Sequence, residues 1–183
     1  MYNFVDTNGY AEGASLPSEA LKINGAYLEH TVTGYRTLYV KGREMLAPDI
    51  ETYETGVRDG STLQSKRFPA RTITVGYQLI ASSAEAFRAA FRALNAALNV
   101  EEAELIFADE PDKFFIGTPS GRGDVPAGRN AITGEFDILC VDPFKYSVQE
   151  YEVTPTLDDG TAFTIQYNGP YRSYPTLVAE FAD

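Results

Sequence analysis

The chain has 183 residues, and its 26 acidic and 15 basic side chains give a formal net charge of −11. A charge of that sign repels nucleic-acid phosphates and anionic lipid headgroups, so neither is an expected binding partner. The single cysteine, Cys140, excludes an internal disulfide, and the single histidine, His30, argues against histidine-based triads and multi-histidine metal sites.

No apolar run approaches the roughly 18 residues that a membrane span needs, and the N-terminus lacks the basic-then-apolar pattern of a secretory signal. The chain is therefore expected to fold in a cytoplasm and to have no membrane partner.

The first part of the chain is expected to be irregular. Residues 1–28 have apolar side chains with no steady period, which indicates an irregular N-terminal arm. Residues 31–41 are rich in β-branched and aromatic side chains, as is typical of a strand.

Residues 44–69 are dense in charge and poor in apolar side chains, so this segment cannot bury much of itself. Arg58-Asp59-Gly60-Ser61 offers a tight-turn sequence between an acidic and a basic limb. The pattern predicts a projecting hairpin, and a mobile, solvated loop is the alternative that composition leaves open.

A strand, one helix and a hairpin follow between residues 71 and 117. Residues 71–80 alternate with period two, and the Ser82–Glu85 spacing of a capping box predicts a helix over residues 83–98. Strands are expected at 103–107 and 114–116. The helix is expected to place four side chains in the core: Phe87, Phe91, Leu94 and Leu98.

The remaining chain alternates turns and short strands. Glycine and proline predict a loop over residues 117–128, and strands are expected at 132–141 and 146–153. Residues 163–167 and 176–181 predict two further strands, which we interpret as the start of an incomplete second sheet, because two strands alone are marginal in water.

No motif points to catalysis. The acidic turn at Asp109, Glu110 and Asp112 has no calcium-loop spacing, and Cys140 is expected to pack as a small hydrophobe. Carboxylates are plentiful, but nothing singles out a pair for hydrolysis. The sequence therefore predicts no catalytic residue, no metal and no cofactor.

Five ordered motifs carry a resemblance to a known family. They are GYRTLYVKGRE at 34–44, RDGS at 58–61, RTITV at 71–75, DEPDKF at 109–114 and CVDPFKY at 140–146. In this order they resemble the distal tail proteins of long-tailed phages (siphophages) that infect Gram-positive bacteria. YNGPYRSYP at 167–175 resembles the entry to the second, galectin-like domain of that family.

The resemblance implies a mainly β fold with one α-helix: a β-sandwich related to phage tail-tube proteins, over residues 29–153, with a projecting hairpin at 44–69. Residues 154–183 would begin an incomplete galectin-like domain. In the family the hairpin embraces the next subunit. Seven residues are therefore expected at the contact between copies: Glu51, Glu54, Arg58, Asp59, Lys66, Arg67 and Arg71.

The resemblance also implies a virion structural protein. Six copies would form a ring that joins the tail tube to the baseplate or tip, with DNA passing through the hole without specific binding. The partners would be the tube protein, the tail-tip protein or tail-associated lysin, and receptor-binding proteins. Two alternatives stay open: a carbohydrate- or receptor-binding module, and a carboxylate-dependent hydrolase.

Overall fold

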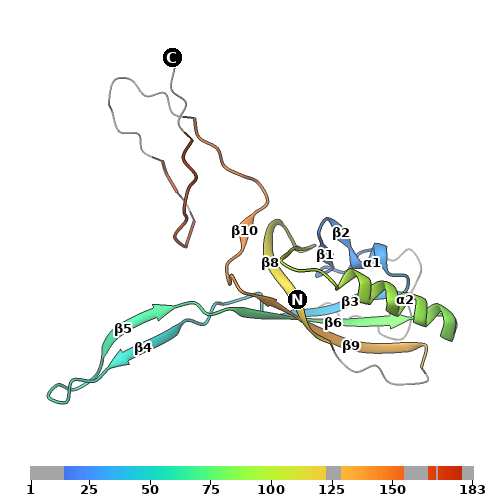
Figure 1. Ribbon diagram of the computed structural model, residues 1–183, viewed down its shortest axis with the longest axis horizontal. Coiled ribbons are helices and arrows are strands. Elements are labelled where there is room, and N and C mark those ends of the chain that lie inside the picture. The colour runs from blue at the N-terminus through green and yellow to red at the C-terminus, as the bar shows by residue number, and fades with distance from the viewer. Residues whose placement is uncertain (1–14, 123–128, 155–164, 168, 179–183) are drawn as a thin grey trace. The chain divides into compact units, whose positions relative to one another are not determined.

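A computed structural model describes residues 15–122, 129–154, 165–167 and 169–178. The chain divides into two compact units, Met1–Gln149 and Glu150–Asp183. The first unit holds the helices and strands of the described residues (Figure 1). In chain order these are β1 Leu21–Ile23, β2 Ala26–Tyr27, α1 Leu28–Thr31, β3 Tyr35–Lys41, β4 Asp49–Tyr53, β5 Thr62–Arg67, β6 Arg71–Ile80, α2 Ala84–Ala97, β7 Ala103–Phe107, β8 Glu110–Arg122, β9 Ala131–Cys140 and β10 Tyr146–Ser147.

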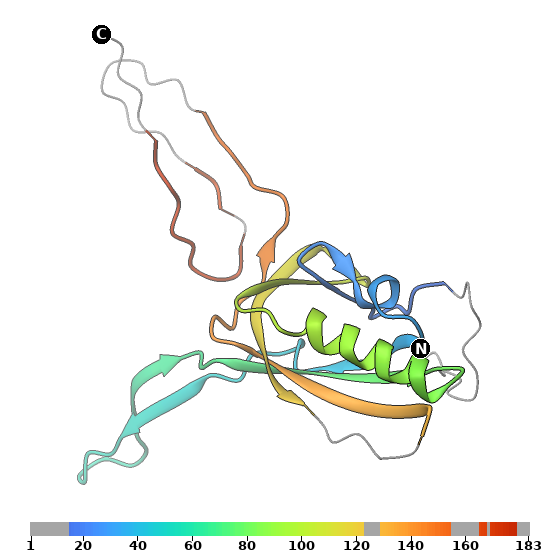
Figure 2. The ribbon, with the colours of Figure 1, turned by 45° about the vertical axis from the view of Figure 1, so that its right-hand side comes forward.

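One antiparallel sheet has the strand order β2-β1-β7-β8-β9-β6-β3, with β10 paired to β8. Its two halves meet at β8, which pairs with β7 along its first part and with β9 along its last. Figure 2 shows α2 between the half that contains β1 and the half that contains β6 and β9. The expected fold class, a mainly β protein with a projecting hairpin, is confirmed, but the structure has a second, one-turn helix, α1, where a single helix was expected.

The longest paired stretch of the sheet is β6–β9. Ten residues of each strand are in register, from Arg71 opposite Cys140 to Ile80 opposite Ala131. Because side chains alternate along a strand, Ile73, Val75 and Leu79 point into the core, where they are almost fully buried. The predicted strand at 71–80 is therefore confirmed to the residue.

Helix α2 begins one residue later than the capping-box spacing indicates. The Ser83 hydroxyl, not that of Ser82, accepts a hydrogen bond from the Ala86 backbone N–H at 3.1 Å. Phe87, Leu94 and Leu98 are buried, and Phe91 is partly buried against the same core. An N-terminal oxygen cap and one apolar face account for a helix at this place.

Three expectations from sequence are wrong. Residues 21–27, expected to be irregular, form β1 and β2, and β1 pairs with β7. Residues 117–122, expected to be loop, continue β8 because β9 supplies their hydrogen-bond partners. The strand expected at 146–153 is confined to β10, Tyr146–Ser147.

Parts of the predicted second sheet lie outside the described residues. Of the strands expected at 163–167 and 176–181, residues 165–167 and 176–178 are described, and these carry no strand. The other residues of both predictions, and residues 1–14 of the predicted N-terminal arm, are outside the described ranges.

Gly117 lies where β8 passes from β7 to β9. A Cβ atom built there would lie 2.7 Å from Ile138 Cγ2, 2.9 Å from Cys140 Sγ and 2.9 Å from Leu105 Cδ1. These atoms belong to the core, so the two halves of the sheet can approach only because residue 117 has no side chain.

Arg43 joins three parts of the chain that are distant in sequence. Its guanidinium makes two hydrogen bonds to the Asp109 carboxylate, both at 2.8 Å, and one to Glu19 Oε1 at 2.9 Å. It also lies over the Phe107 ring, 4.3 Å from the centroid. Only 12% of the Arg43 side chain is exposed, whereas those of Glu19 and Asp109 are 32% and 37% exposed, so solvent screens these contacts in part.

Arg71 completes this junction from the other end of the hairpin. Its Nη1 donates to the Gly42 and Arg43 carbonyl oxygens at 3.2 and 3.0 Å, and its guanidinium lies over the Phe115 ring. The two chain segments that enter and leave the hairpin are therefore tied to each other and to β7 and β8.

Gly117→Ala is expected to destabilise the protein by about 1–3 kcal/mol, because the added methyl overpacks the core. Gly56→Ala is the matched control, since a Cβ there meets no atom within 4 Å and its change should stay within about 0.5 kcal/mol. Urea unfolding measures both. Equal stabilities for the two variants would contradict the packing argument.

Arg43→Met is expected to lower the free energy of unfolding by roughly 2 kcal/mol, because it removes charge-assisted hydrogen bonds to two carboxylates. Arg67→Met is the control. Arg67 also pairs with an aspartate, Asp49, at 3.4 Å, but its side chain is 79% exposed, so we expect a change below about 0.5 kcal/mol.

The Arg43 contact also predicts a pH dependence. The hydrogen bond from Arg43 holds the pKa of the Asp109 carboxyl below its usual value. A carboxyl whose pKa is lower in the folded state stabilises the fold above its unfolded pKa of about 4, and that stabilisation is lost as the pH falls through the folded pKa.

Wild type should therefore exceed Asp109→Asn in stability at neutral pH, and the difference should shrink below about pH 4. A difference that is constant from pH 7 to pH 3 in thermal unfolding would contradict this.

Candidate functional site

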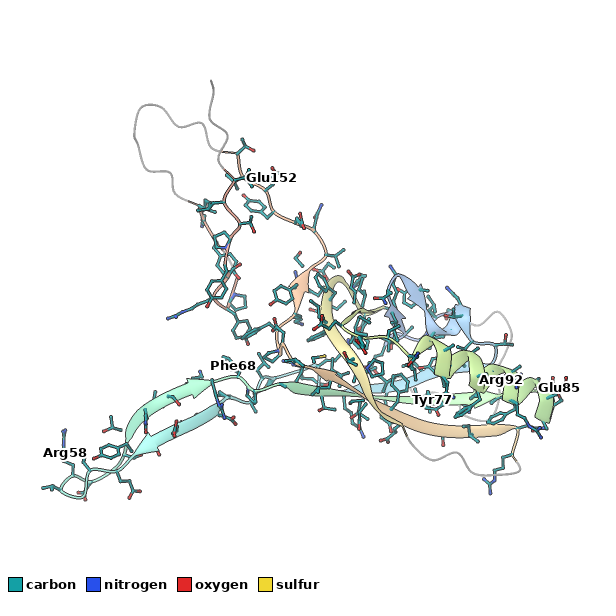
Figure 3. All side chains as sticks on the ribbon, viewed as in Figure 1. Arg58, Phe68, Tyr77, Glu85, Arg92 and Glu152 are labelled. Carbon is teal, nitrogen blue, oxygen red and sulfur yellow. The ribbon has the colours of Figure 1, made fainter. Side chains whose placement is uncertain are left out.

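The segment of residues 44–69, here called the arm, is the most exposed ordered part of the first unit. All residues of β4 and β5 are exposed, and the two strands pair only with each other. Figure 3 shows the arm running from Phe68 at its root to Arg58 at its tip, away from the body of the sheet. An isolated two-stranded hairpin is marginally stable in water, so a surface that covered this arm would stabilise it.

One face of the arm carries polar side chains that form a hydrogen bond and an ion pair with each other. Ser65 Oγ donates to Glu51 Oε2 at 3.0 Å, and Arg67 Nη2 lies 3.4 Å from Asp49 Oδ2. These four side chains share a face because directly opposed residues of a hairpin point to the same side.

The other face of the arm carries Ile50, Thr52, Leu63 and Lys66. The strand register pairs Ile50 with Lys66 and Thr52 with Leu63, on either side of an irregularity after Glu51. Ile50 and Leu63 are each 61% exposed. The arm is therefore amphipathic, with one face that meets no apolar partner among the described residues of its own chain.

The structure distributes the seven predicted contact residues over four places: the two faces of the arm, its tip and the body. Glu51 and Arg67 lie on the polar face, and Glu54, Arg58 and Asp59 surround the exposed tip. The Lys66 ammonium lies 5.4 Å from the centroid of the Phe68 ring. Arg71 differs from the rest because it belongs to the body, where it holds the root of its own arm.

Sequence reasoning missed the apolar face of the arm. Its signal was the alternation in Asp49–Tyr53, where isoleucine stands between two acids, but the charge density of the segment obscured it. The pairing of β4 with β5, which brings Leu63 to the same face, follows from the register and not from composition.

The edges of the sheet are poorly suited to adding a strand from another molecule. Along the outer edge strand β3, the Thr37 N–H donates to Glu29 Oε1 at 2.9 Å and the Val40 N–H to Glu19 Oε2 at 3.3 Å. The opposite edge, β2, is two residues long. Side chains that occupy backbone donors and very short edge strands are known protections against edge pairing. These two edges of the sheet are therefore protected against strand addition.

The single cysteine is not placed as a nucleophile. Cys140 is fully buried, and burial raises the pKa of its thiol to about 11, so it is an unreactive thiol at neutral pH. The described ranges contain no cluster of three or more metal-ligating side chains. Within the same ranges, no helix is long and apolar enough to cross a membrane.

Comparisons with known proteins agree with this geometry. No curated protein matches the chain. Among solved structures, the crystal structure of the Dit protein (gp 19.1) of phage SPP1 is similar with a TM-score of 0.61 and 19% identity, over 70% of this chain and 51% of that one. That protein is described as a paradigm of the hub adsorption apparatus in phages that infect Gram-positive bacteria, and the present chain spans about half of its length.

A family model covers just over half of the sequence. Residues 41–139, which include the arm, α2 and the strands β6 to β9, match the phage tail protein RIFT-related domain. The sequence motifs resemble phage tail components, and both the family model and the fold indicate a phage tail component. The chain belongs to the phage tail protein RIFT-related domain family, and its fold is that of a siphophage distal tail protein.

Proposed function

We propose that this chain is a structural hub of a siphophage tail: copies close into a ring, expected to have six members, that joins the tail tube to the baseplate or tip. The observation that carries the proposal is the exposed arm in a protein of a phage tail family. A hairpin that buries nothing on its own body gains apolar contacts by lying on a neighbour. A head-to-tail contact repeated about a rotation axis closes a ring.

The blocked edges of the sheet support the same assembly. Strand addition at β3 or β2 would give a sheet that grows from copy to copy, and the Glu19 and Glu29 contacts oppose it. A clasp by the arm uses side chains and leaves both edges as they are. In this proposal the tip residues Glu54, Arg58 and Asp59 meet the next copy.

The acidic balance fits a conduit for DNA. A net charge of −11 repels phosphates, so DNA passes a wall of this chain without being held by counterion release. The remaining partners in the proposal are the tube protein, the tail-tip protein or lysin, and receptor-binding proteins. In this proposal the protein is located in the virion, after assembly in the host cytoplasm.

A structural role is favoured over the hydrolase alternative. A general acid needs a carboxyl whose pKa is raised, whereas the pKa of the Asp109 carboxyl is lowered by its contact with Arg43. The surface hollow along Ala84, Glu85, Arg88 and Arg92 has a single carboxyl, and the hollow at the arm tip, which includes Glu54 and Asp59, is open to solvent and does not enclose a substrate. We propose that the chain is not an enzyme and needs no cofactor.

One observation favours a second candidate, a carbohydrate- or receptor-binding module. Tyr167 and Tyr174 are exposed in the second unit, and exposed tyrosines are frequent at binding surfaces. This candidate treats residues 154–183 as part of a galectin-like domain. It requires saccharide or receptor binding by a monomeric chain, whereas the hub requires a ring.

Removal of residues 53–65 is expected to leave a folded monomer, while the wild type assembles. The deletion takes away most of the arm but leaves the core and the Arg43 junction untouched. Light scattering coupled to gel filtration measures the mass, and circular dichroism with thermal unfolding checks the fold.

The matched control is the double variant Arg88→Ala/Arg92→Ala, which removes exposed charge from α2 and should keep the wild-type mass. An intact ring after the arm deletion would contradict the proposal that the arm holds neighbouring copies together. A wild type that stays monomeric at every concentration and binds a saccharide would favour the second candidate.

A further inference from the structure

We propose that the apolar face of the arm lies on a defined strip of a second copy, formed by Ile116, Leu139, Val141 and Tyr146. This inference rests on the proposed assembly through the arm and adds where the arm lies and which of its faces is buried.

The strip lies on the outer face of the sheet where β8, β9 and β10 meet. Phe115 is buried in the core, so its neighbour Ile116 points to the opposite side. The register pairs Thr118 with Leu139, which places Ile116 across from Val141 on the adjoining strand. Val141 is 76% exposed, and Ile116 and Leu139 are exposed beside it.

Tyr146 extends the strip along β10. It pairs with Phe114, two residues before Ile116 on the same side of β8, and the two rings lie 5.8 Å apart. Exposed apolar side chains that gather on one face of a soluble protein typically mark a contact surface. Here they form a continuous band across three strands.

The root of the same chain's arm contacts the segment between Val141 and Tyr146, where the centroids of the Phe68 and Phe144 rings lie 5.7 Å apart, and the rest of the arm leads away. β5 ends at Arg67 and β6 begins at Arg71, so the short connection keeps the arm in line with β6, and Figure 1 shows it leading away from the sheet. The Arg43 and Arg71 contacts hold the root in that direction. In this proposal the occupant of the strip is the arm of another copy, because the arm of the same chain leads away from the sheet (Figure 1).

The two surfaces are complementary in charge as well as in polarity. Lys66 lies on the apolar face of the arm, next to Ile50, whereas the acids Asp49 and Glu51 are on the other face. The outer row of β9 continues from Leu139 to Asp137 and Glu135. An arm laid with Ile50 and Leu63 on Leu139 and Val141 brings Lys66 near these carboxylates and leaves its polar face to solvent.

The test is a cross-link between copies. Ile50→Cys and Val141→Cys chains are mixed and treated with a short bismaleimide at neutral pH, where the buried Cys140 thiol stays protonated. Glu51→Cys with Val141→Cys is the matched control, because Glu51 neighbours Ile50 and points to the opposite side of the arm. We expect the Ile50 pair to give covalent dimers at least tenfold faster than the Glu51 pair.

A second measurement uses association strength. Val141→Ser is expected to weaken self-association at least tenfold, and Thr133→Ser, an exposed change on the same face of β9, should leave it unchanged. Wild type that assembles, with equal cross-linking of the two pairs and no effect of Val141→Ser, would overturn this seat for the arm but leave the ring standing. Wild type that remains monomeric would overturn both proposals.

Discussion

The two-point attachment of Arg43 is the interaction on which the arrangement of this molecule depends. A guanidinium that bridges Asp109 and Glu19 ties the turn between β7 and β8, the segment before β1, and the start of the arm to a single place. The planar fork of arginine matches a carboxylate in both hydrogen bonds, which lysine cannot do. Because Arg71 donates to the carbonyl groups of Gly42 and Arg43, the segment that leaves the arm is fixed at the same junction as the segment that enters it.

A fixed root gives the arm a direction, and direction is what a repeated contact requires. If the arm pivoted freely, each copy would pay the entropy of ordering it on binding, and the angle between neighbours would not be set. In the proposed assembly, a held root would let copies clasp one another at one angle, so that geometry would determine their number in a closed ring. The amphipathic register of β4 and β5 would then decide which side of the arm faces the neighbour.

The protection of the sheet edges also bears on the proposed assembly, because it disfavours pairing between the strands of two copies. A mainly β protein that assembles through an exposed hairpin is at risk of pairing through its strands instead. Glu19 and Glu29 occupy backbone N–H groups along β3, and Glu19 also accepts from Arg43. One carboxylate, that of Glu19, thus contacts both the edge strand β3 and the root of the arm.

The sequence by itself determined those elements whose signals are local. Period-two alternation predicted β6 and most of β9, one apolar face predicted α2, and the charge density of residues 44–69 predicted an arm that does not bury itself. The ordered motifs also indicated the phage tail family.

Tertiary structure decided the remaining elements, because their conformation depends on partners far along the chain. Residues 117–122 became strand against local glycine and proline because β9 pairs with them, and residues 21–23 became strand because β7 does. Arg71 reads as one more charge of the arm until folding places it on the carbonyl groups at the other end of the same arm. Neither hydrogen bond leaves a trace in local composition, since its two groups are separated by the whole hairpin.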